Sequence, residues 1–286
     1  MTIRNPVEWT FEQARLGARA AEAAGRNLAR PHEAFDAPKP MVRHIAIPDL
    51  MDCLKRGFED FQSYRTDVLF IGIIYPLAGL VLGRLMFGYD MLPLLFPLVS
   101  GFALIGPLAA TGLFEMSRRR EQEGEVTWLD AFKAFRSPAI GEIVKFGLVL
   151  VGIYVLWMCA AALIYGATMG WHVPASLSAF AQAVITTPAG WALMVIGVGV
   201  GFCFALAVLA IGAVTVPLLL DRNVDAFTAM RTSVEVMRVN PAPILAWGAI
   251  VAGLLVAGAV PLLLGLIVVM PVLGHATWHL YRRAVL

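Results

Sequence analysis

The sequence contains few charged residues and few cysteines. Charged residues make up 15% of its 286 residues, compared with roughly 25% in ordinary soluble domains. The three cysteines are Cys53, Cys159 and Cys203, and no two of them form a Cys-x-x-Cys pair. This excludes a disulfide framework and a cysteine-based metal site. The net charge of +2 is too small to indicate a nucleic-acid partner.

Sequence motifs of common enzyme classes are also missing. The chain has no glycine-rich phosphate loop, no nucleophile elbow and no H-E-x-x-H zinc motif, all of which have a recognisable residue spacing. No pair of carboxylates is placed for acid–base catalysis. We therefore predict that the protein is not an enzyme, and we expect no cofactor.

Apolar residues dominate what is present. They make up 59% of the chain, and the mean hydropathy is +0.75. A helical crossing of the bilayer needs about 20 apolar residues, so the long apolar runs predict a polytopic membrane protein in a lipid bilayer. Residues 1–45 form a polar, partly helical cytoplasmic leader without the apolar core of a signal peptide. Residues 46–286 form the membrane domain, with crossings at about 68–87, 92–116, 143–165, 189–220, 244–258 and 261–281.

The positions of the basic residues predict the orientation. An even number of crossings places both termini on one side, and cytoplasmic segments carry an excess of Lys and Arg. With both termini in the cytoplasm, all of the 22 Lys and Arg residues except Arg84 fall in cytoplasmic segments. We therefore predict a multi-pass protein of the bacterial inner membrane with both termini cytoplasmic.

A polar phrase occurs twice in the chain. "DAFKAFRS" begins at Asp130 and "DAFTAMRT" begins at Asp225. The two phrases share an acidic, an aromatic and a basic position, which are Asp130, Phe132 and Arg136 in the first and Asp225, Phe227 and Arg231 in the second. Their apolar positions have helical spacing, which predicts an amphipathic helix that lies in the cytoplasmic interface or packs across the helix ends.

A related segment, "IPDLMDCLKRGFEDF", precedes the first predicted crossing, and each even-numbered crossing has a Pro in its inner half and a basic exit. We predict an all-α fold, a six-helix transmembrane bundle of three helical-hairpin repeats. A cytoplasmic amphipathic interfacial helix precedes each hairpin. The alternative is that amphipathic helices and basic ends recur in any membrane protein.

His275 and His279 are the strongest candidates for ligand binding. They are four residues apart, so they share one helix face and could bind a metal ion or haem. However, no Asp, Glu or Cys accompanies them in "GHATWHLYRR". The alternative is a belt at the headgroup level, formed by the histidines with Trp278 and Tyr281.

Four charged residues lie near the ends of predicted crossings: Arg84, Glu115, Glu142 and Lys145. Glu142 and Lys145 have the spacing of an ion pair on a helix, and Glu115 can pair with Arg118 or Arg119. Arg84 can extend to the outer interface or pair with Asp90. No charge falls in the middle of a crossing, which argues against an ion-coupled carrier.

Several long segments resemble a known family. They are "DVLFIGIIYPLAGL", "LLFPLVSGFALIGPLAATGLFEMSRRRE", "TTPAGWALMVIGVGVGF", "VPLLLDR", "VNPAPILAWG" and "MPVLGHATWHLYRR". Together they resemble proteobacterial integral membrane proteins catalogued as domain of unknown function two-one-eight-nine, from about Ile45 to Arg283. The resemblance implies an inner-membrane protein without an established activity. Such proteins are sometimes loosely named cytochrome c oxidase subunit I-like, but this chain lacks the histidines which that enzyme needs on several helices.

These observations leave three functional hypotheses. The first is an accessory or scaffold subunit that contacts another membrane complex, for example a respiratory one, through small-residue faces such as Gly197 and Gly201. The alternative is a small transporter or lipid-handling protein, with a cavity among proline-kinked helices. A second alternative is haem or metal binding through His275 and His279.

Overall fold

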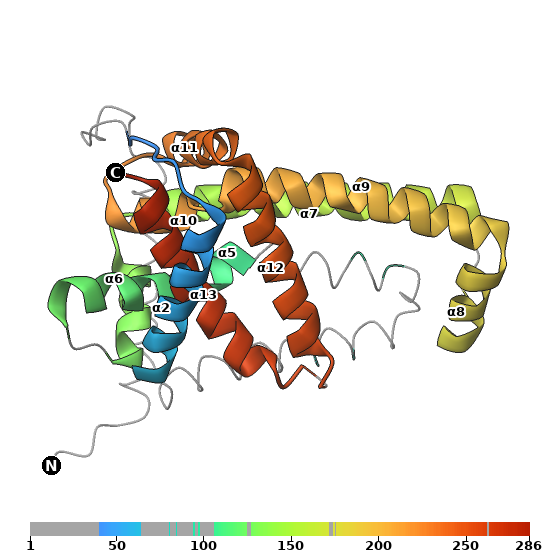
Figure 1. Ribbon diagram of the computed structural model, residues 1–286. Coiled ribbons are helices and arrows are strands. Elements are labelled where there is room, and N and C mark those ends of the chain that lie inside the picture. Colours follow the sequence, from blue (N-terminus) through green and yellow to red (C-terminus); the bar gives the residue numbers. More distant parts are fainter. Residues whose placement is uncertain are drawn as a thin grey trace, which may run out of the picture.

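The computed structural model of the protein describes residues 40–63, 80, 84, 94, 97, 106–124, 127–171, 174, 176–261 and 263–286. In this part of the chain the regular elements are all helices, which confirms the predicted all-α class (Figure 1). The one β-type pairing in the described residues is an isolated antiparallel bridge between Val42 and Val285. This bridge holds the C-terminal end of the chain beside the segment that leads into the first described helix.

The described helices are α2 (Ile47–Ser63), α5 (Gly106–Ala109), α6 (Thr111–Glu123), the 3₁₀ helix η3 (Trp128–Arg136), α7 (Ile140–Met169), α8 (Leu177–Thr186), α9 (Pro188–Gly212), α10 (Thr215–Asp221), α11 (Ala226–Val239), α12 (Pro241–Ala259) and α13 (Leu266–Ala284).

Three helical stretches are long and apolar enough to cross a membrane: Ile140–Met169, Pro188–Asp221 and Pro241–Ala259. They coincide with the predicted third, fourth and fifth crossings. The integral-membrane character is therefore supported by the structure. The predicted first crossing and the outer part of the second lie almost entirely outside the described residues.

The predicted fourth crossing is interrupted near its inner end. α9 ends at Gly212 and α10 begins at Thr215, with a turn between them. Pro217 explains the interruption, because a proline lacks the N–H that would bond to the carbonyl four residues earlier, and its ring clashes with that carbonyl. The helix is therefore interrupted one turn before Pro217, and α10 continues to Asp221.

The predicted sixth crossing differs from expectation. α13 begins at Leu266 and is not among the stretches long and apolar enough to cross. Its second half packs against α2 and carries the buried polar residue His275. Figure 1 shows α12 and α13 running across the direction of α7 and α9. The described helices thus form two diverging hairpins and not one parallel bundle.

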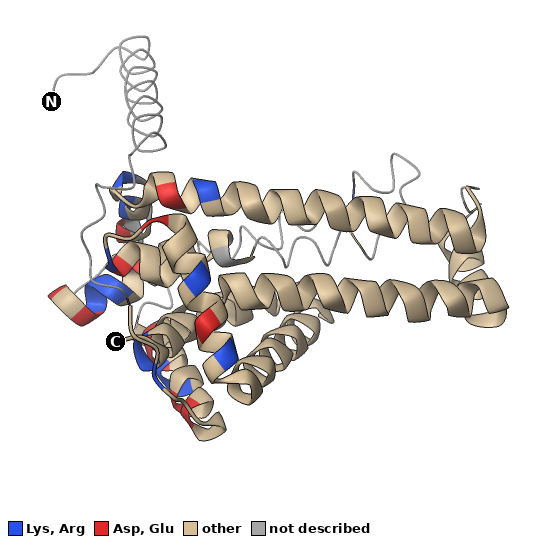
Figure 2. Cartoon of the chain, turned by 90° about the horizontal axis from the view of Figure 1, so that it is seen from above, with Lys and Arg blue, Asp and Glu red and all other residues tan. Residues whose placement is uncertain are grey.

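The charged residues gather at one end of the molecule. Figure 2 shows Lys, Arg, Asp and Glu of the described residues concentrated at one end of the molecule, from which the long α7 and α9 extend away. α7 has no charged residue after Lys145, and α9 has none at all. This separation agrees with a charged part at the membrane surface and an apolar hairpin, formed by α7 and α9, that enters the bilayer. We call the charged part, which includes α2, α6, α11 and the C-terminal half of α13, the polar platform.

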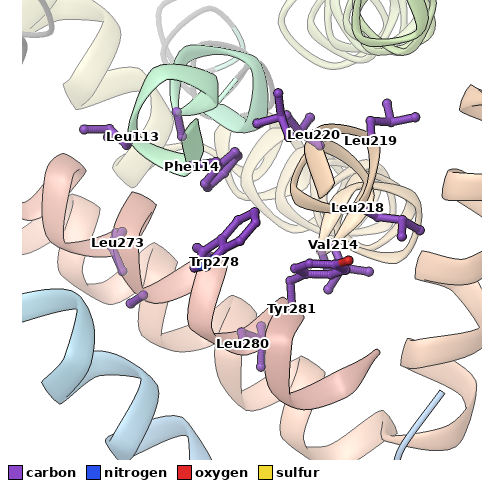
Figure 3. Close-up of a cluster of buried hydrophobic side chains, with 14 of the residues drawn as sticks. Leu113, Phe114, Val214, Leu218, Leu219, Leu220, Leu273, Trp278, Leu280 and Tyr281 are labelled. Carbon is purple, nitrogen blue, oxygen red and sulfur yellow. The ribbon is translucent and has the colours of Figure 1, made fainter. Parts of the chain in front are cut away.

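An apolar core holds the charged end together. Phe114 of α6, Leu218 of α10, and Trp278 and Tyr281 of α13 are all at most 2% exposed, and the rings of Phe114 and Trp278 lie next to each other (Figure 3). Burial of a side chain such as Leu218 contributes about 1.5–3 kcal/mol. Trp278 and Tyr281 are therefore core residues, and the alternative that places them in a headgroup belt is wrong. Their polar atoms are satisfied inside the protein, since the Tyr281 hydroxyl donates to Asp221 at 2.6 Å.

The first repeated phrase forms η3, a 3₁₀ helix. A capping box begins it, in which the Asp130 carboxylate accepts a hydrogen bond from the Thr127 backbone N–H at 2.8 Å. Asp130 is buried and also forms an ion pair with Lys133, while Arg136 is exposed. The side chain of Phe132 lies outside the described residues.

The second repeated phrase forms the start of α11. Asp225 caps the helix by accepting a hydrogen bond from the Thr228 N–H at 3.0 Å. The side that packs inward consists of small residues such as Ala229 and Ser233, whereas Phe227 is 69% exposed and Arg231 is exposed. Because α11 packs through its small side chains, its aromatic side faces away from the protein.

Candidate functional site

α2 packs closely against α13, and this contact assembles the candidate site. A Cβ atom at Gly57 would lie 2.6 Å from both the Cβ and the backbone N of Ala276, so only glycine permits this approach. On the same side of α2, Leu50 and Cys53 are at most 1% exposed. The close approach brings Asp60, one turn beyond Gly57, beside the two histidines of α13.

Asp60 is the centre of a buried polar cluster, which consists of Asp60, Ser117, Arg120, His275 and His279. The Oδ2 atom of Asp60 accepts a hydrogen bond from the Ser117 hydroxyl at 2.9 Å and lies 3.0 Å from His279 Nε2. Its Oδ1 atom forms an ion pair with Arg120. Asp60 is only 6% exposed. One carboxylate thus connects α2 to both α6 and α13.

Ser117 links Asp60 to His275. Its Oγ atom lies 2.7 Å from His275 Nδ1 as well as 2.9 Å from Asp60. An ionised carboxylate can only accept hydrogen bonds, so Ser117 donates to Asp60 and accepts from His275 Nδ1–H. Neutral His275 then has an unprotonated Nε2 atom, which is fully buried and has no hydrogen-bond partner among the described residues.

The surroundings of Asp60 favour its ionised form. Burial acts to raise the pKa of this carboxyl, but the hydrogen bonds from His279 and Ser117 and the charges of the neighbouring imidazoles lower it, and the pKa lies below the ordinary value of 3.8. A charged acceptor makes stronger hydrogen bonds than a neutral one. The polar cluster therefore fastens three helices to one another.

The arrangement of the histidines does not fit a haem or a metal ion. The described residues contain no group of three His, Cys, Asp or Glu side chains that could hold a metal. His275 is fully buried, and the cavity beside His279 has a volume of about 170 Å³, whereas pockets for drug-sized ligands measure roughly 300 Å³ or more. Since His275 bonds to Ser117 and His279 bonds to Asp60, we assign both histidines a structural role, in which they connect α13 to α6 and α2.

The charged residues predicted at the helix ends form local pairs. Lys145 Nζ lies 2.7 Å from Glu142 Oε1, and Glu142 also accepts a hydrogen bond from the Ala226 N–H at 2.9 Å. Glu142 is 3% exposed, so it joins the start of α7 to the start of α11 in the protein interior.

Glu115 is 1% exposed and pairs with both of its predicted partners, Arg118 and Arg119, at 2.8 and 2.7 Å. The hydrogen bond with Glu115 raises the pKa of Arg118 although burial opposes this. Arg84 lies in a helical position and is exposed. Its predicted partner Asp90 lies outside the described residues.

Sequence analysis missed Asp60, Ser117 and Arg120. Asp60 stands near the end of "IPDLMDCLKRGFEDF", on a helix that we expected to lie in the interface with its polar side toward the cytoplasm. The structure instead packs that helix along α13. The available signal was Gly57, a glycine in the interior of an otherwise good helix sequence, because such a residue often marks a close approach of two backbones.

Comparison with known proteins identifies a family for the central part of the chain. Residues 95–221 match the model of a family described as "Predicted integral membrane protein (DUF2189)". No curated protein and no solved structure matches the chain. The matched residues include Ser117 and Arg120 of the polar cluster and the whole of α7 and α9. Residues 95–221 are therefore similar to this family of predicted integral membrane proteins, and the resemblance seen in the sequence is confirmed for these residues. Its extension to about Ile45 and Arg283 stays a prediction.

Proposed function

We propose that the protein is an accessory or scaffold subunit of the bacterial inner membrane, and that it contacts another membrane protein through the outer faces of α7 and α9. The exposure of this hairpin is the observation that supports the proposal. α9 buries only Gly190, Val208 and Gly212 among the described residues. Most of its length therefore presents side chains outward, to lipid or to a partner.

Two glycines on the outward faces of α7 and α9 favour a protein partner over lipid as the neighbour of this hairpin. A Cβ atom at Gly152 of α7 or at Gly199 of α9 would meet no described atom within 4 Å. Gly152 lies one turn from Leu148 and Leu156, which are 64% and 63% exposed. Gly199 lies one turn from Val195 and Phe202 on α9, which are 70% and 59% exposed. Each glycine thus forms a depression between large apolar side chains on an outward face.

Such a depression has a cost and a use. Glycine in a helix interior is about 1 kcal/mol less favourable than alanine, and contact with lipid tails offers no compensation. In membranes, small residues at the surface of a helix allow the backbone of a second helix to approach closely. The outward positions of Gly152 and Gly199 therefore favour a transmembrane helix of another protein as the neighbour of this hairpin.

The packing of Gly201 supports this assignment. Sequence analysis grouped Gly201 with Gly197 as one packing face. Gly201 packs within the hairpin, where its Cβ position would lie 3.0 Å from the Trp157 ring. Gly197 has no such neighbour among the described atoms. The internal contact of the hairpin is thus served by Gly201, and the other glycines are available to a partner.

The proposal assigns the protein no catalytic step. Ion pairs join α2 to α6 and α13, and α13 to α6 and α10. Most of the described Lys and Arg residues lie at this polar end, which supports a cytoplasmic position for it. The polar platform would then anchor the hairpin at the cytoplasmic surface.

Photo-crosslinking in native membranes tests the proposal. A photoreactive amino acid replaces Leu156 or Val195 beside the glycines, and Val256, a 66% exposed residue of α12, is the matched control. We expect a discrete protein adduct from the first two positions but not from Val256. Gly152→Leu and Gly199→Leu should abolish the adduct by filling the depressions. Adducts with lipid alone, or only within the chain, would contradict the proposal.

A further inference from the structure

A small cavity opens at the charged end of the molecule, beside the polar cluster. Its volume is about 170 Å³, and it is lined by Cys53, Arg56, Glu121, His279, Arg282 and Arg283. α2, α6 and α13 all contribute to it. The guanidinium groups of three arginines, Arg56, Arg282 and Arg283, therefore line this space.

Two of the arginines are held in place by carboxylates. Arg282 Nε lies 3.1 Å from Glu121, and Arg283 Nη2 lies 2.9 Å from Asp52. Arg283 also pairs with Asp49 and Arg282 with Asp221. A guanidinium has five N–H donors, and these contacts occupy only some of them. The acidic partners thus orient Arg282 and Arg283 and leave N–H groups for a further acceptor.

Arg56 is the arginine of the cavity whose charge is not neutralised by a described carboxylate. It is exposed on α2, and it forms no ion pair with the described carboxylates. Cys53, at the floor of the cavity, is a neutral thiol, because burial raises its pKa to about 11. The free donors of the cavity thus come from arginines, whose planar fork matches the oxygens of a phosphate group.

We infer that this cavity binds the phosphodiester of an anionic lipid headgroup. Glu121 and the carboxylates that pair with Arg282 and Arg283 offset much of the positive charge around the cavity, so the cavity suits a singly charged phosphodiester better than a doubly charged phosphate. The volume fits the phosphoryl group of a lipid and excludes the acyl chains. Basic pockets beside membrane helices on the cytoplasmic side are suited to such headgroups.

Binding to the delipidated full-length protein in detergent tests the inference. The probes are short-chain phosphatidylglycerol, the zwitterionic short-chain phosphatidylcholine and inorganic phosphate, and native mass spectrometry measures binding. We expect one phosphatidylglycerol per chain, with phosphatidylcholine and inorganic phosphate both bound more weakly. Arg56→Gln should weaken phosphatidylglycerol binding about tenfold, which corresponds to the loss of one charge-assisted hydrogen bond.

Lys55→Gln is the matched control, since Lys55 is exposed on the same helix but does not line the cavity. Both substitutions lie at the surface, so neither should prevent folding. The inference is overturned if phosphatidylcholine binds as tightly as phosphatidylglycerol, or if the two variants bind phosphatidylglycerol equally. Inorganic phosphate that binds as tightly as phosphatidylglycerol would also overturn it, because the site would then serve free phosphate.

Discussion

Replacement of Asp60 by Asn tests whether the polar cluster fastens α2 to the rest of the protein. The Asp60 carboxylate interacts with Ser117 and His279 through Oδ2 and with Arg120 through Oδ1. Asparagine keeps one oxygen and replaces the other with an NH₂ group. In one orientation the amide oxygen faces Ser117 and His279, and the NH₂ group faces the cation of Arg120. In the flipped orientation the oxygen faces Arg120, and the NH₂ group faces Ser117 and His279. At least one contact is therefore lost in either orientation.

The expected cost follows from these contacts. A hydrogen bond to a charged group contributes about 1.5–3 kcal/mol, and Ser117, His279 and Arg120 each lose their charged acceptor. The side chain of Arg120 is 33% exposed, so water compensates part of its loss. We therefore expect Asp60→Asn to lower the free energy of unfolding by about 2–4 kcal/mol.

Two assays measure this effect in detergent. Denaturant unfolding gives the change in stability, and the labelling rate of Cys53 reports locally on α2, because this thiol is 1% exposed in the contact with α13. The labelling uses a background in which the exposed Cys159 and Cys203 are replaced by alanine. Asp60→Asn should label Cys53 faster than the parent protein does.

Asp52→Asn is the control for the Asp60 variant. Asp52 lies on the same helix and pairs with Arg283 at 2.9 Å, but its side chain is 60% exposed. Exposed ion pairs contribute about 1 kcal/mol or less, so this variant should be close to the parent protein. Equal stability and equal labelling of the two variants would refute the role assigned to the cluster.

Three further predictions concern the same contacts. Gly57→Ala should destabilise the protein by about 1–3 kcal/mol in thermal unfolding, because the added Cβ would lie 2.6 Å from Ala276. Gly253→Ala, at a position on α12 with open space, should not. Since the pKa of Asp60 is lowered in the folded state, its contribution to stability should be complete above the ordinary value of 3.8 and be lost as the pH falls through the lower folded-state value. Unfolding measured across acidic pH should show this loss in the parent protein and not in Asp60→Asn. Glu142→Gln should cost about 1–3 kcal/mol in denaturant unfolding, since Glu142 bonds to Lys145 and the Ala226 N–H, whereas stability unchanged from the parent would show that this link contributes little.

Composition and hydrophobic runs were sufficient to predict the class of the protein. α7 and α12 begin and end within a few residues of the predicted third and fifth crossings, and α9 together with α10 covers the predicted fourth, because long apolar runs have only one stable form in a bilayer. Local spacing also predicted the pairing of Glu142 with Lys145 and of Glu115 with its two arginines. Such contacts depend only on neighbouring turns of one helix, so the sequence contains all the information that they need.

The polar cluster could not be predicted in the same way. Asp60 and His279 are 219 residues apart in the chain, and nothing in either local sequence indicates that the two helices meet. The same limit applies to α11, where helical spacing predicted an amphipathic helix with an apolar side, whereas the side that packs carries small residues such as Ala229 and Ser233. Spacing alone does not decide which side packs, and the small residues packed because they allow the closer approach.

The position of the polar cluster also determines how much of α13 can lie in hydrocarbon. The apolar part of this helix runs from Leu266 to Gly274, before the buried His275, which at 1.5 Å per residue is about 13 Å. The hydrocarbon core is about 30 Å thick, and charged groups such as Asp60 and Arg120 are costly within it. The polar cluster is therefore expected to lie outside the hydrocarbon, and the apolar part of α13 is shorter than a full crossing. A helical hairpin returns to the side of the membrane from which it enters, whether or not it crosses completely. The prediction that both termini lie on one side therefore does not require α12 and α13 to form complete crossings.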